Sequence, residues 1–141
     1  MTLPGFRARV RAATVLALGF FPHLVSAGAL TLPVYFESNT GQAGPQTRFI
    51  GRAQGYSLLM GEKALEIEAG GGAAPVWARF AGASKNPAVE ALEPLPTRVN
   101  YYIGDASHWV SGASCWARVR YKELYPGIEL EFYLQDRTIE Y

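Results

Sequence analysis

The chain has 141 residues and carries 13 Lys or Arg against 12 Asp or Glu, which gives a formal net charge of +1. This length sets a limit of one small domain, and a charge so near balance excludes the strongly basic surface of a nucleic-acid-binding protein. Cys115 is the only cysteine, so the domain has no internal disulfide and must rely on its apolar core. We expect the thiol to be buried and inert; the alternatives are a reactive thiol or an intermolecular disulfide.

The first 27 residues have the order of a secretory signal peptide. A start with three arginines precedes a nearly continuous apolar run over residues 12–25, and small residues follow up to Ala27. This order predicts export, with cleavage after Ala27 or, as the alternative, after Ala29. The apolar run is shorter than the ~20 residues of a membrane-spanning helix. We therefore expect contact with a membrane only through the transient signal peptide.

Cleavage would leave residues 28–141 as a single domain with ten basic and twelve acidic side chains. Apolar–polar alternation and Gly/Pro turns predict an all-β, mostly antiparallel, sandwich-like meander with little helix outside the signal peptide. Loops are expected at residues 69–75 and 111–114, and one short helical turn at 106–110. Outside the C-terminal hairpin described next, the predicted strands are residues 31–36, 47–51, 56–60, 63–68, 76–81, 89–92, 99–103 and 138–141.

The clearest element is a hairpin over residues 117–133. Apolar residues alternate with Arg118 and Arg120 before the turn, and with Glu129 and Glu131 after it. A Pro-Gly pair between the two runs has the composition of a tight turn. If the strands pair, the arginines face the glutamates, and cross-strand ion pairs worth ~0.2–1 kcal/mol each help to fix the register.

Four residues in or beside predicted turns are candidates for anchors of the neighbouring loops. Asn39, Gly41, Gln42 and Asn100 are expected to hold these loops through hydrogen bonds between side chain and backbone. Contact with a ligand is the alternative for the same residues.

Three tryptophans, Trp77, Trp109 and Trp116, stand out together with eight tyrosines. Buried, such rings fill the core of a β domain. Exposed, they stack on sugar rings or contact a protein partner. The sequence leaves both interpretations open, so these tryptophans are the candidate ligand or partner contacts.

The sequence offers few groups for catalysis. After signal cleavage His108 is the only histidine, and Asp105 and Ser107 lie beside it, which we interpret as loop polarity. Glu129 and Glu131 share one strand face and form the weaker, glycosidase-like alternative, because paired carboxylates perform glycoside hydrolysis. The scattered histidine, cysteine and acidic residues have no metal-ligand spacing, so we predict no catalytic residue, no metal and no cofactor.

Four segments in series resemble one known family. They are residues 32–42 (LPVYFESNTGQ), 49–58 (FIGRAQGYSL), 92–105 (LEPLPTRVNYYIGD) and 121–133 (YKELYPGIELEFY). Their order and spacing resemble the N-terminal domain of unknown function in large secreted bacterial proteins with SBBP repeats of β-propeller type. In that family the domain continues beyond the strand that ends this chain. The resemblance therefore implies a C-terminally truncated copy and repeat domains downstream.

These observations lead to one main hypothesis and two alternatives. We expect a non-enzymatic structural or interaction module of a secreted or cell-surface protein, with downstream repeat domains or an extracellular protein or glycan as partner. The first alternative is a carbohydrate-binding or adhesion domain that uses exposed aromatic rings. The second is a glycosidase-like enzyme acting through Glu129 and Glu131.

Overall fold

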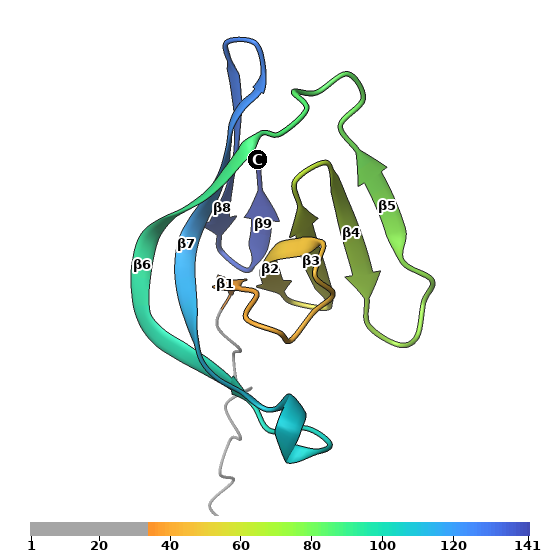
Figure 1. The fold of residues 1–141 in the computed structure, drawn as a ribbon, viewed down its shortest axis with the longest axis vertical. Helices are drawn as coiled ribbons and strands as arrows, with labels where there is room; N and C mark the ends of the chain where they lie inside the picture. Colours follow the sequence, from red (N-terminus) through yellow and green to blue (C-terminus); the bar gives the residue numbers. More distant parts are fainter. Residues whose placement is uncertain (1–33) are drawn as a thin grey trace, which may run out of the picture. The chain divides into compact units, whose positions relative to one another are not determined.

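The computed structural model of the protein describes residues 34–141, which form one antiparallel β-sheet with a single turn of 3₁₀ helix (Figure 1). The all-β prediction is confirmed. The predicted signal peptide, with its cleavage points after Ala27 or Ala29, lies outside the described residues. The elements are β1 (Tyr35–Ser38), β2 (Thr47–Ala53), β3 (Tyr56–Gly61), β4 (Ala64–Ala69), β5 (Val76–Arg79), β6 (Ala88–Tyr101), η1 (Ala106–His108), β7 (Val110–Tyr125), β8 (Ile128–Gln135) and β9 (Thr138–Glu140).

The first five strands form a meander in which each strand pairs with the next. A turn at Gln54-Gly55 joins β2 to β3, and Gly55 has a φ of +88°, a conformation that favours glycine. Among the described strands β5 pairs with β4 alone, so β5 is an edge of the sheet.

The long strand β7 is the centre of the second half of the sheet. Trp116 is paired with β6 on one side and with Phe36 of β1 on the other. Further along, Val119 is paired with β6 and with Phe132 of β8. Because a strand has only two edges, β1 and β8 occupy the same edge of β7, one after the other.

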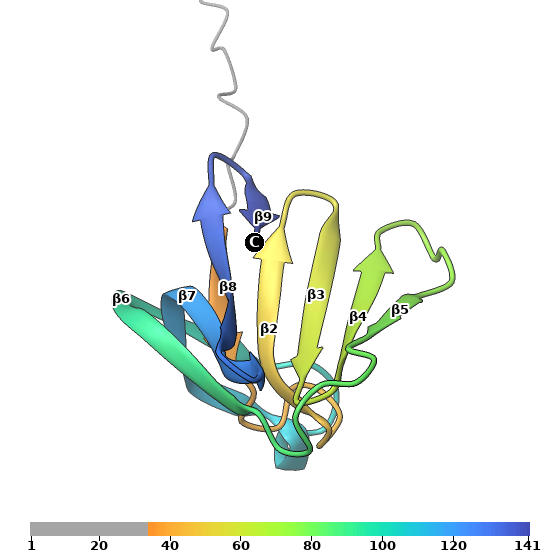
Figure 2. The same cartoon turned by 90° about the horizontal axis from the view of Figure 1, so that it is seen from above.

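The sheet is strongly curled, so that β7–β9 face β2–β4 across the core (Figures 1 and 2). At the closing point Ile139 of β9 lies over Gly51 of β2, where a Cβ atom would come within 2.5 Å of the Ile139 side chain. The Ile139 N–H donates to the Tyr56 hydroxyl at 3.1 Å. A side chain at position 51 would force the end of the Ile139 side chain to move, so glycine favours this close approach. The buried core cluster consists of Phe36, Leu58, Met60, Leu65, Val119, Tyr121, Leu124 and Phe132.

The predicted C-terminal hairpin is confirmed as β7 and β8 joined at Pro126 and Gly127, where Gly127 has a φ of +71°. Alternation places Val119, Tyr121 and Phe132 in the core, where they are at most 4% exposed. Tyr121 also donates its hydroxyl proton to a backbone carbonyl of β3 at 2.7 Å, so its polar end is satisfied inside the core.

The outer face of β6–β8 carries alternating charges. Arg118 Nη1 lies 2.6 Å from Glu131 Oε1, and Arg120 Nη1 lies 3.5 Å from Glu129 Oε2, which confirms the predicted cross-strand pairs. Two glutamates of β6 contact the same arginines at 2.9 and 3.1 Å. These side chains are 30–60% exposed. We call this set the Arg–Glu ladder; its members are Glu90, Glu93, Arg118, Arg120, Glu129 and Glu131.

Two of the predicted boundaries are wrong. Residues 89–92 and 99–103, expected as separate strands, lie largely in the single strand β6. Pro94 and Pro96 are tolerated there because β6 is an edge strand that pairs with β7 alone among the described strands. Residues 111–114, expected as a loop, belong to β7. The other predicted strands overlap β1–β5 and β9, and the predicted helical turn overlaps η1.

Candidate functional site

A shallow pocket of about 400 Å³ lies on the outer face of β2–β5. Strand register places Trp77 beside Glu66, and Glu66 beside Leu59, so these side chains form one row on the face opposite the core residues Leu58 and Leu65. Trp77 is 54% exposed. We call this site the Trp77 pocket; its other lining residues are Pro45, Gln46, Thr47, Arg48, Gly61, Glu62, Lys63 and Ala64.

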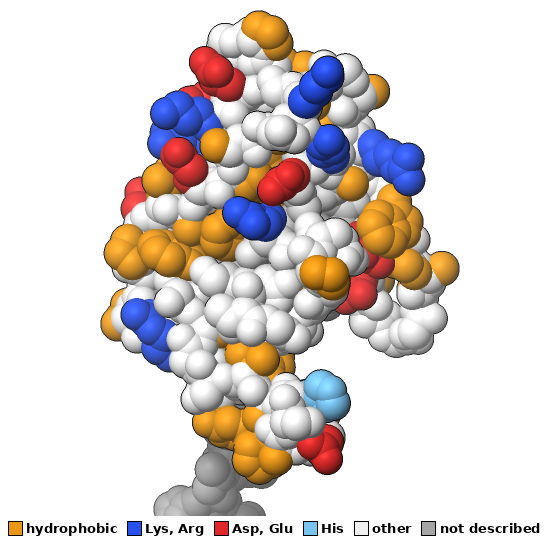
Figure 3. Space-filling model, in the orientation of Figure 1, with side chains coloured by type: hydrophobic (Ala, Val, Ile, Leu, Met, Phe, Trp, Pro, Cys, Tyr) orange, Lys and Arg blue, Asp and Glu red, His pale blue; other side chains and the backbone are white. Residues whose placement is uncertain are grey.

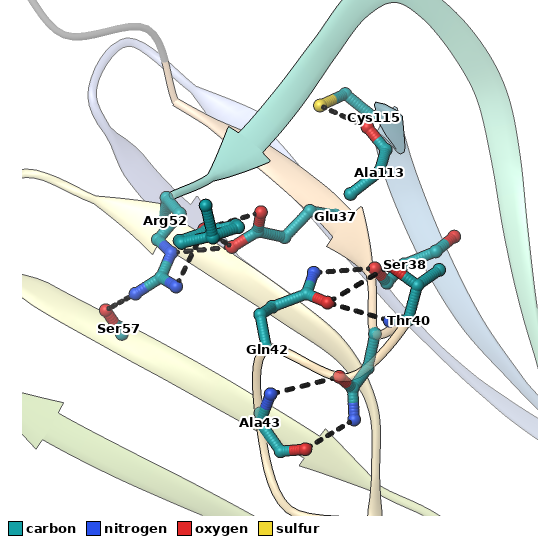
Figure 4. Close-up of polar contacts among 11 residues, drawn as sticks. Glu37, Ser38, Thr40, Gln42, Ala43, Arg52, Ser57, Ala113 and Cys115 are labelled. Atoms are coloured by element: carbon teal, nitrogen blue, oxygen red, sulfur yellow. Dashed lines mark hydrogen bonds and ion pairs between the residues drawn. The ribbon is translucent and has the colours of Figure 1, made fainter. Parts of the chain in front are cut away.

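One wall of the Trp77 pocket is the end of the loop between β1 and β2, and this loop is held by Asn39. The Asn39 amide nitrogen donates to three backbone carbonyls of the segment at 2.8–3.2 Å. Its Oδ1 accepts from the backbone N–H groups of Gly41 and Ala43. The Gln42 amide donates to the Ser38 carbonyl at 2.8 Å (Figure 4). The prediction that Asn39 and Gln42 anchor a loop is confirmed.

The rim of the Trp77 pocket carries two cations and two carboxylates. They are Arg48 and Lys63 against Glu62 and Glu66. Arg48 Nε and Glu62 Oε1 lie 4.0 Å apart with both side chains about half exposed, which is a weak contact. Glycine is needed at position 61, because a Cβ atom there would come within 2.9 Å of a backbone oxygen of the loop.

A second exposed surface lies at the end of the β6–β7 ribbon, which extends away from the rest of the sheet (Figure 1). Tyr102, Ile103 and Trp109 are 58%, 77% and 50% exposed. The Tyr102 and Trp109 rings meet edge to face with centroids 5.2 Å apart. Hydrophobic side chains gather at this lower end of the molecule in Figure 3. We call these three residues the aromatic tip.

Local hydrogen bonds hold the aromatic tip in shape. Asn100 Oδ1 accepts from the backbone N–H of Gly112 at 2.8 Å, so this asparagine anchors its loop as predicted. Asp105 accepts from both the backbone N–H and the hydroxyl of Ser107, which caps η1 and lowers the pKa of Asp105. The Trp109 indole N–H donates to a backbone carbonyl within the loop at 3.3 Å.

The residues beside His108 are arranged as a cap. Ser107 Oγ lies 2.6 Å from Asp105 Oδ1 and 3.4 Å from His108 Nδ1. In a catalytic triad the imidazole lies between the nucleophile and the carboxylate. Here the serine occupies the middle position, so the arrangement supports loop polarity as the role of these residues.

Sequence reasoning did not identify the network around Glu37, a fully buried carboxylate on β1. Arg52 Nε donates to Glu37 at 2.7 Å, and the Tyr101 hydroxyl lies 2.6 and 2.7 Å from the two carboxylate oxygens. Arg52 also donates to Ser57 at 2.8 Å (Figure 4). Burial, followed by the Glu37 contact, raises the pKa of Tyr101 to about 12. We call Glu37, Arg52 and Tyr101 the buried triad.

The buried triad fixes the base of the β6–β7 ribbon. Glu37 lies in β1, Arg52 in β2 and Tyr101 at the last position of β6. Tyr102, the next residue, begins the aromatic tip. The network therefore connects the ribbon to the meander and sets where the tip begins.

The third candidate tryptophan has a different environment. Trp116 is partly buried, packs against the core and donates its indole N–H to the Ser38 hydroxyl at 2.9 Å. Cys115 beside it is fully buried, as expected, and burial followed by the charge of Glu37 raises the pKa of its thiol. The structure thus separates the three tryptophans: Trp77 lines a pocket, Trp109 lies in the tip, and Trp116 borders the core.

The two carboxylates considered for glycoside hydrolysis belong to the Arg–Glu ladder. Glu129 and Glu131 each contact an arginine, and neither lines the Trp77 pocket. Within residues 34–141, no group of three or more His, Cys, Asp or Glu side chains is placed to hold a metal ion. In the same range no helix has the length and hydropathy of a membrane span.

An apolar cavity of about 530 Å³ lies between β3–β5 and β8–β9. It continues from the core, since Leu58, Leu65 and Phe132 belong to both. One of its lining residues, Tyr141, is 84% exposed. Its other lining residues are Tyr56, Ile67, Ala78, Phe80, Leu130 and Ile139.

The fold and its two exposed aromatic surfaces define an all-β domain built on one curled antiparallel sheet. Residues 36–141 match the model of a family described as a domain of unknown function, DUF7948, and the chain therefore belongs to this family. The matched range begins in β1 and includes all later described strands, so the curled sheet lies within the part of the chain that matches the family. No curated protein and no solved structure matches the chain.

Proposed function

We propose that this domain is a non-enzymatic interaction module of a secreted or cell-surface protein, and that the aromatic tip is its contact surface for a protein partner. The observation that carries the proposal is the exposure of Tyr102, Ile103 and Trp109 together at the end of one ribbon. Contiguous exposed apolar side chains rimmed by polar groups are characteristic of protein interaction sites.

The chemistry of the tip fits a binding hot spot. Tryptophan and tyrosine are the residues on which protein interfaces most often depend. The tip is also preorganised, because Asn100 and the Asp105 cap fix its backbone and the buried triad fixes its base. A surface that is already ordered loses little conformational entropy when it binds.

The sequence supports the proposed cellular location and the proposed position of the domain in a longer chain. The predicted signal peptide supports export, and the resemblance to the N-terminal domain of SBBP-repeat proteins supports a place at the head of a longer chain. The partner is then a downstream repeat domain or a separate extracellular protein. Mass spectrometry of the exported protein tests the setting, with a mature N-terminus at Gly28, or at Leu30 for the alternative cleavage.

Photo-crosslinking tests the tip itself. A benzoylphenylalanine placed at Ile103 is expected to give one discrete adduct in the producing cells, either with another protein or with a later part of the same polypeptide. The matched control carries the same probe at Arg137, an exposed residue in the β8–β9 turn. The adduct should be lost with Trp109→Ser and kept with Trp77→Ser. Identical adduct patterns at the two probe positions would contradict the proposal.

The carbohydrate-binding alternative is favoured by a separate observation, the Trp77 pocket. It requires neither the aromatic tip nor a protein partner. The two candidates are distinguished by which tryptophan matters, Trp109 for the protein contact and Trp77 for the sugar.

A further inference from the structure

We propose that the Trp77 pocket is a binding subsite for one neutral sugar ring of an extended polysaccharide. This inference goes beyond the protein contact proposed for the aromatic tip and stands on different residues. The volume of the Trp77 pocket, about 400 Å³, lies toward the lower end of the range of small-molecule sites. The site therefore has the size for a single ring and the ring's immediate substituents.

The indole of Trp77 supplies the surface on which a sugar stacks. The C–H groups on one face of a pyranose are apolar, so they pack on an aromatic face while the hydroxyl groups remain free at the ring's edge. Trp77 is 54% exposed and lies on the edge strand β5. A long polymer can therefore run past the ring without meeting a neighbouring strand of the described sheet.

The polar groups around the indole match sugar hydroxyls, each of which both donates and accepts hydrogen bonds. Glu66 lies directly across from Trp77 in the β4–β5 register and accepts. Lys63 and Arg48 donate, and the Gln46 amide does both. The pocket thus combines an apolar platform with convergent donors and acceptors, as sites for small polar ligands do.

The balance of charge selects a neutral ligand. Arg48 and Lys63 are opposed by Glu62 and Glu66 on the same rim. A phosphate, a sulfate or a uronic acid would gain from the two cations and lose by a similar amount to the two carboxylates. A neutral ring experiences neither effect and uses all four groups as hydrogen-bonding partners.

The wall facing Trp77 is fixed before any ligand binds. Asn39 makes five hydrogen bonds within the β1–β2 loop, and Gly61 lets that loop lie close against β3. A rigid wall lowers the entropy cost of binding. The loop anchor that the sequence predicted thus acquires a role in shaping the site.

Binding of the full chain to defined polysaccharides tests the proposal. The neutral probes are barley β-glucan, xylan and galactomannan in affinity electrophoresis, and cellulose and chitin in pull-down. The anionic probes are polygalacturonate and dextran sulfate. We expect at least one neutral polymer to bind, with affinity little changed in 0.5 M NaCl because a neutral ligand is not screened, and both anionic polymers to bind more weakly.

Four variants assign the binding to the pocket. Trp77→Ala should weaken it by about tenfold or more, as expected for an aromatic anchor, while Trp77→Phe should retain part of the affinity. Glu66→Gln, which keeps the indole, should weaken it less than Trp77→Ala. Trp109→Ala is the matched control, since it removes an equally exposed tryptophan outside the pocket, and it should leave binding unchanged. Circular dichroism verifies that each variant is folded.

Three outcomes would overturn the proposal. They are no binding to any neutral probe, binding that survives Trp77→Ala, and stronger binding to the anionic polymers that salt removes. If Trp77→Ala does not fold, Trp77→Phe and Glu66→Gln decide, and unchanged affinity in both overturns it. None of these outcomes bears on the tip, whose test is the crosslink at Ile103.

Discussion

The buried triad and the Arg–Glu ladder use the same chemistry in opposite environments. In the triad Glu37 is fully buried and meets Arg52 at 2.7 Å, with a tyrosine hydroxyl on both carboxylate oxygens. In the ladder Arg118 meets Glu131 at 2.6 Å, an equally short contact. The two arginines are similarly exposed, at 34% for Arg52 and 40% for Arg118, but Glu131 is 34% exposed where Glu37 is fully buried. Distance alone does not distinguish the two pairs.

Solvent separates their energetic roles. Water competes for the groups of the ladder and screens them, so each pair there contributes little. Glu37 has no access to water, so removing its partner or its charge leaves a buried group unsatisfied. We therefore expect substitutions in the triad to destabilise the domain several times more than the matching substitutions in the ladder.

The largest effect is expected for Glu37→Gln. The change leaves Arg52 without its counter-ion and a buried amide with poorer geometry, and loss of one partner of a buried pair costs about 3–5 kcal/mol. Arg52 is 34% exposed, so water can partly hydrate its charge once the carboxylate is gone. We therefore expect the loss of unfolding free energy to lie near the lower end of this range, about 3 kcal/mol. Urea unfolding followed by circular dichroism measures it. A loss below that of Glu131→Gln would reverse the comparison.

Tyr101→Phe should rank second. It removes one hydroxyl bound to a carboxylate and leaves the Glu37–Arg52 ion pair intact, and hydrogen bonds to charged groups contribute about 1.5–3 kcal/mol. Hydrogen exchange provides a local readout, since amides of the β6–β7 ribbon should exchange faster while those of β3 and β4 keep their protection. Uniform loosening of all strands would show that Tyr101 does not hold the ribbon specifically.

The triad also predicts a loss of stability in alkali. Burial, followed by the contact with Glu37, raises the pKa of Tyr101 to about 12 in the folded protein, above the ordinary value for tyrosine of about 10. The folded state therefore holds this proton more tightly, so the contribution is complete below pH 10 and is lost as the pH rises toward 12. Unfolding free energies of the wild type and Tyr101→Phe should converge over this interval. A difference that stays constant from pH 8 to 12 would contradict the assignment.

The smallest effects are expected in the ladder. Glu131→Gln should cost about 0.5–1 kcal/mol, because it breaks the shortest contact of the set, and Glu129→Gln about 0–0.5 kcal/mol. Both losses should shrink in 1 M NaCl, where exposed charges are screened, whereas the cost of Glu37→Gln should persist. If Glu131→Gln costs as much unfolding free energy in 1 M NaCl as at low salt, the ladder is not screened by solvent and the contrast with the buried triad is wrong.

The ladder was predictable from the sequence, and the triad was not. Alternation in two neighbouring strands of one hairpin places Arg118 and Arg120 on the same face as the two glutamates, which is enough to predict cross-strand ion pairs. The exact partners depend on a β-bulge between Tyr121 and Tyr125, which shifts the register and has no clear signal in the sequence. Arg52 and Tyr101 lie 15 and 64 positions from Glu37, and only the sheet topology joins them. The available signal was a glutamate within the short, aromatic strand at Tyr35–Ser38, where a charge needs a partner.

The candidate sites also contain some features that the local sequence predicts and others that depend on the sheet topology. The sequence identified Trp77, Trp109 and Trp116 but could not separate them, since exposure depends on which strands cover each face. It predicted the anchoring role of Asn39, because that chemistry is local. The pocket beside Trp77 needs residues of β3, β4 and the β1–β2 loop, and register across three strands decides that grouping.

The shared edge of β7 sets an order of events during synthesis. The β1–β5 meander is synthesised first, but β1 can pair with β7 only after Trp116, the partner of Phe36, has been synthesised. β8 must then pair with β7 along the same edge, from Arg118 onward, while β1 stays paired at Cys115 and Trp116. Closing so long a loop is slow, so we expect formation of the β1–β7 pairing to be one of the slow steps of folding. Substitutions there should delay maturation, while changes in the aromatic tip should leave its rate unaltered.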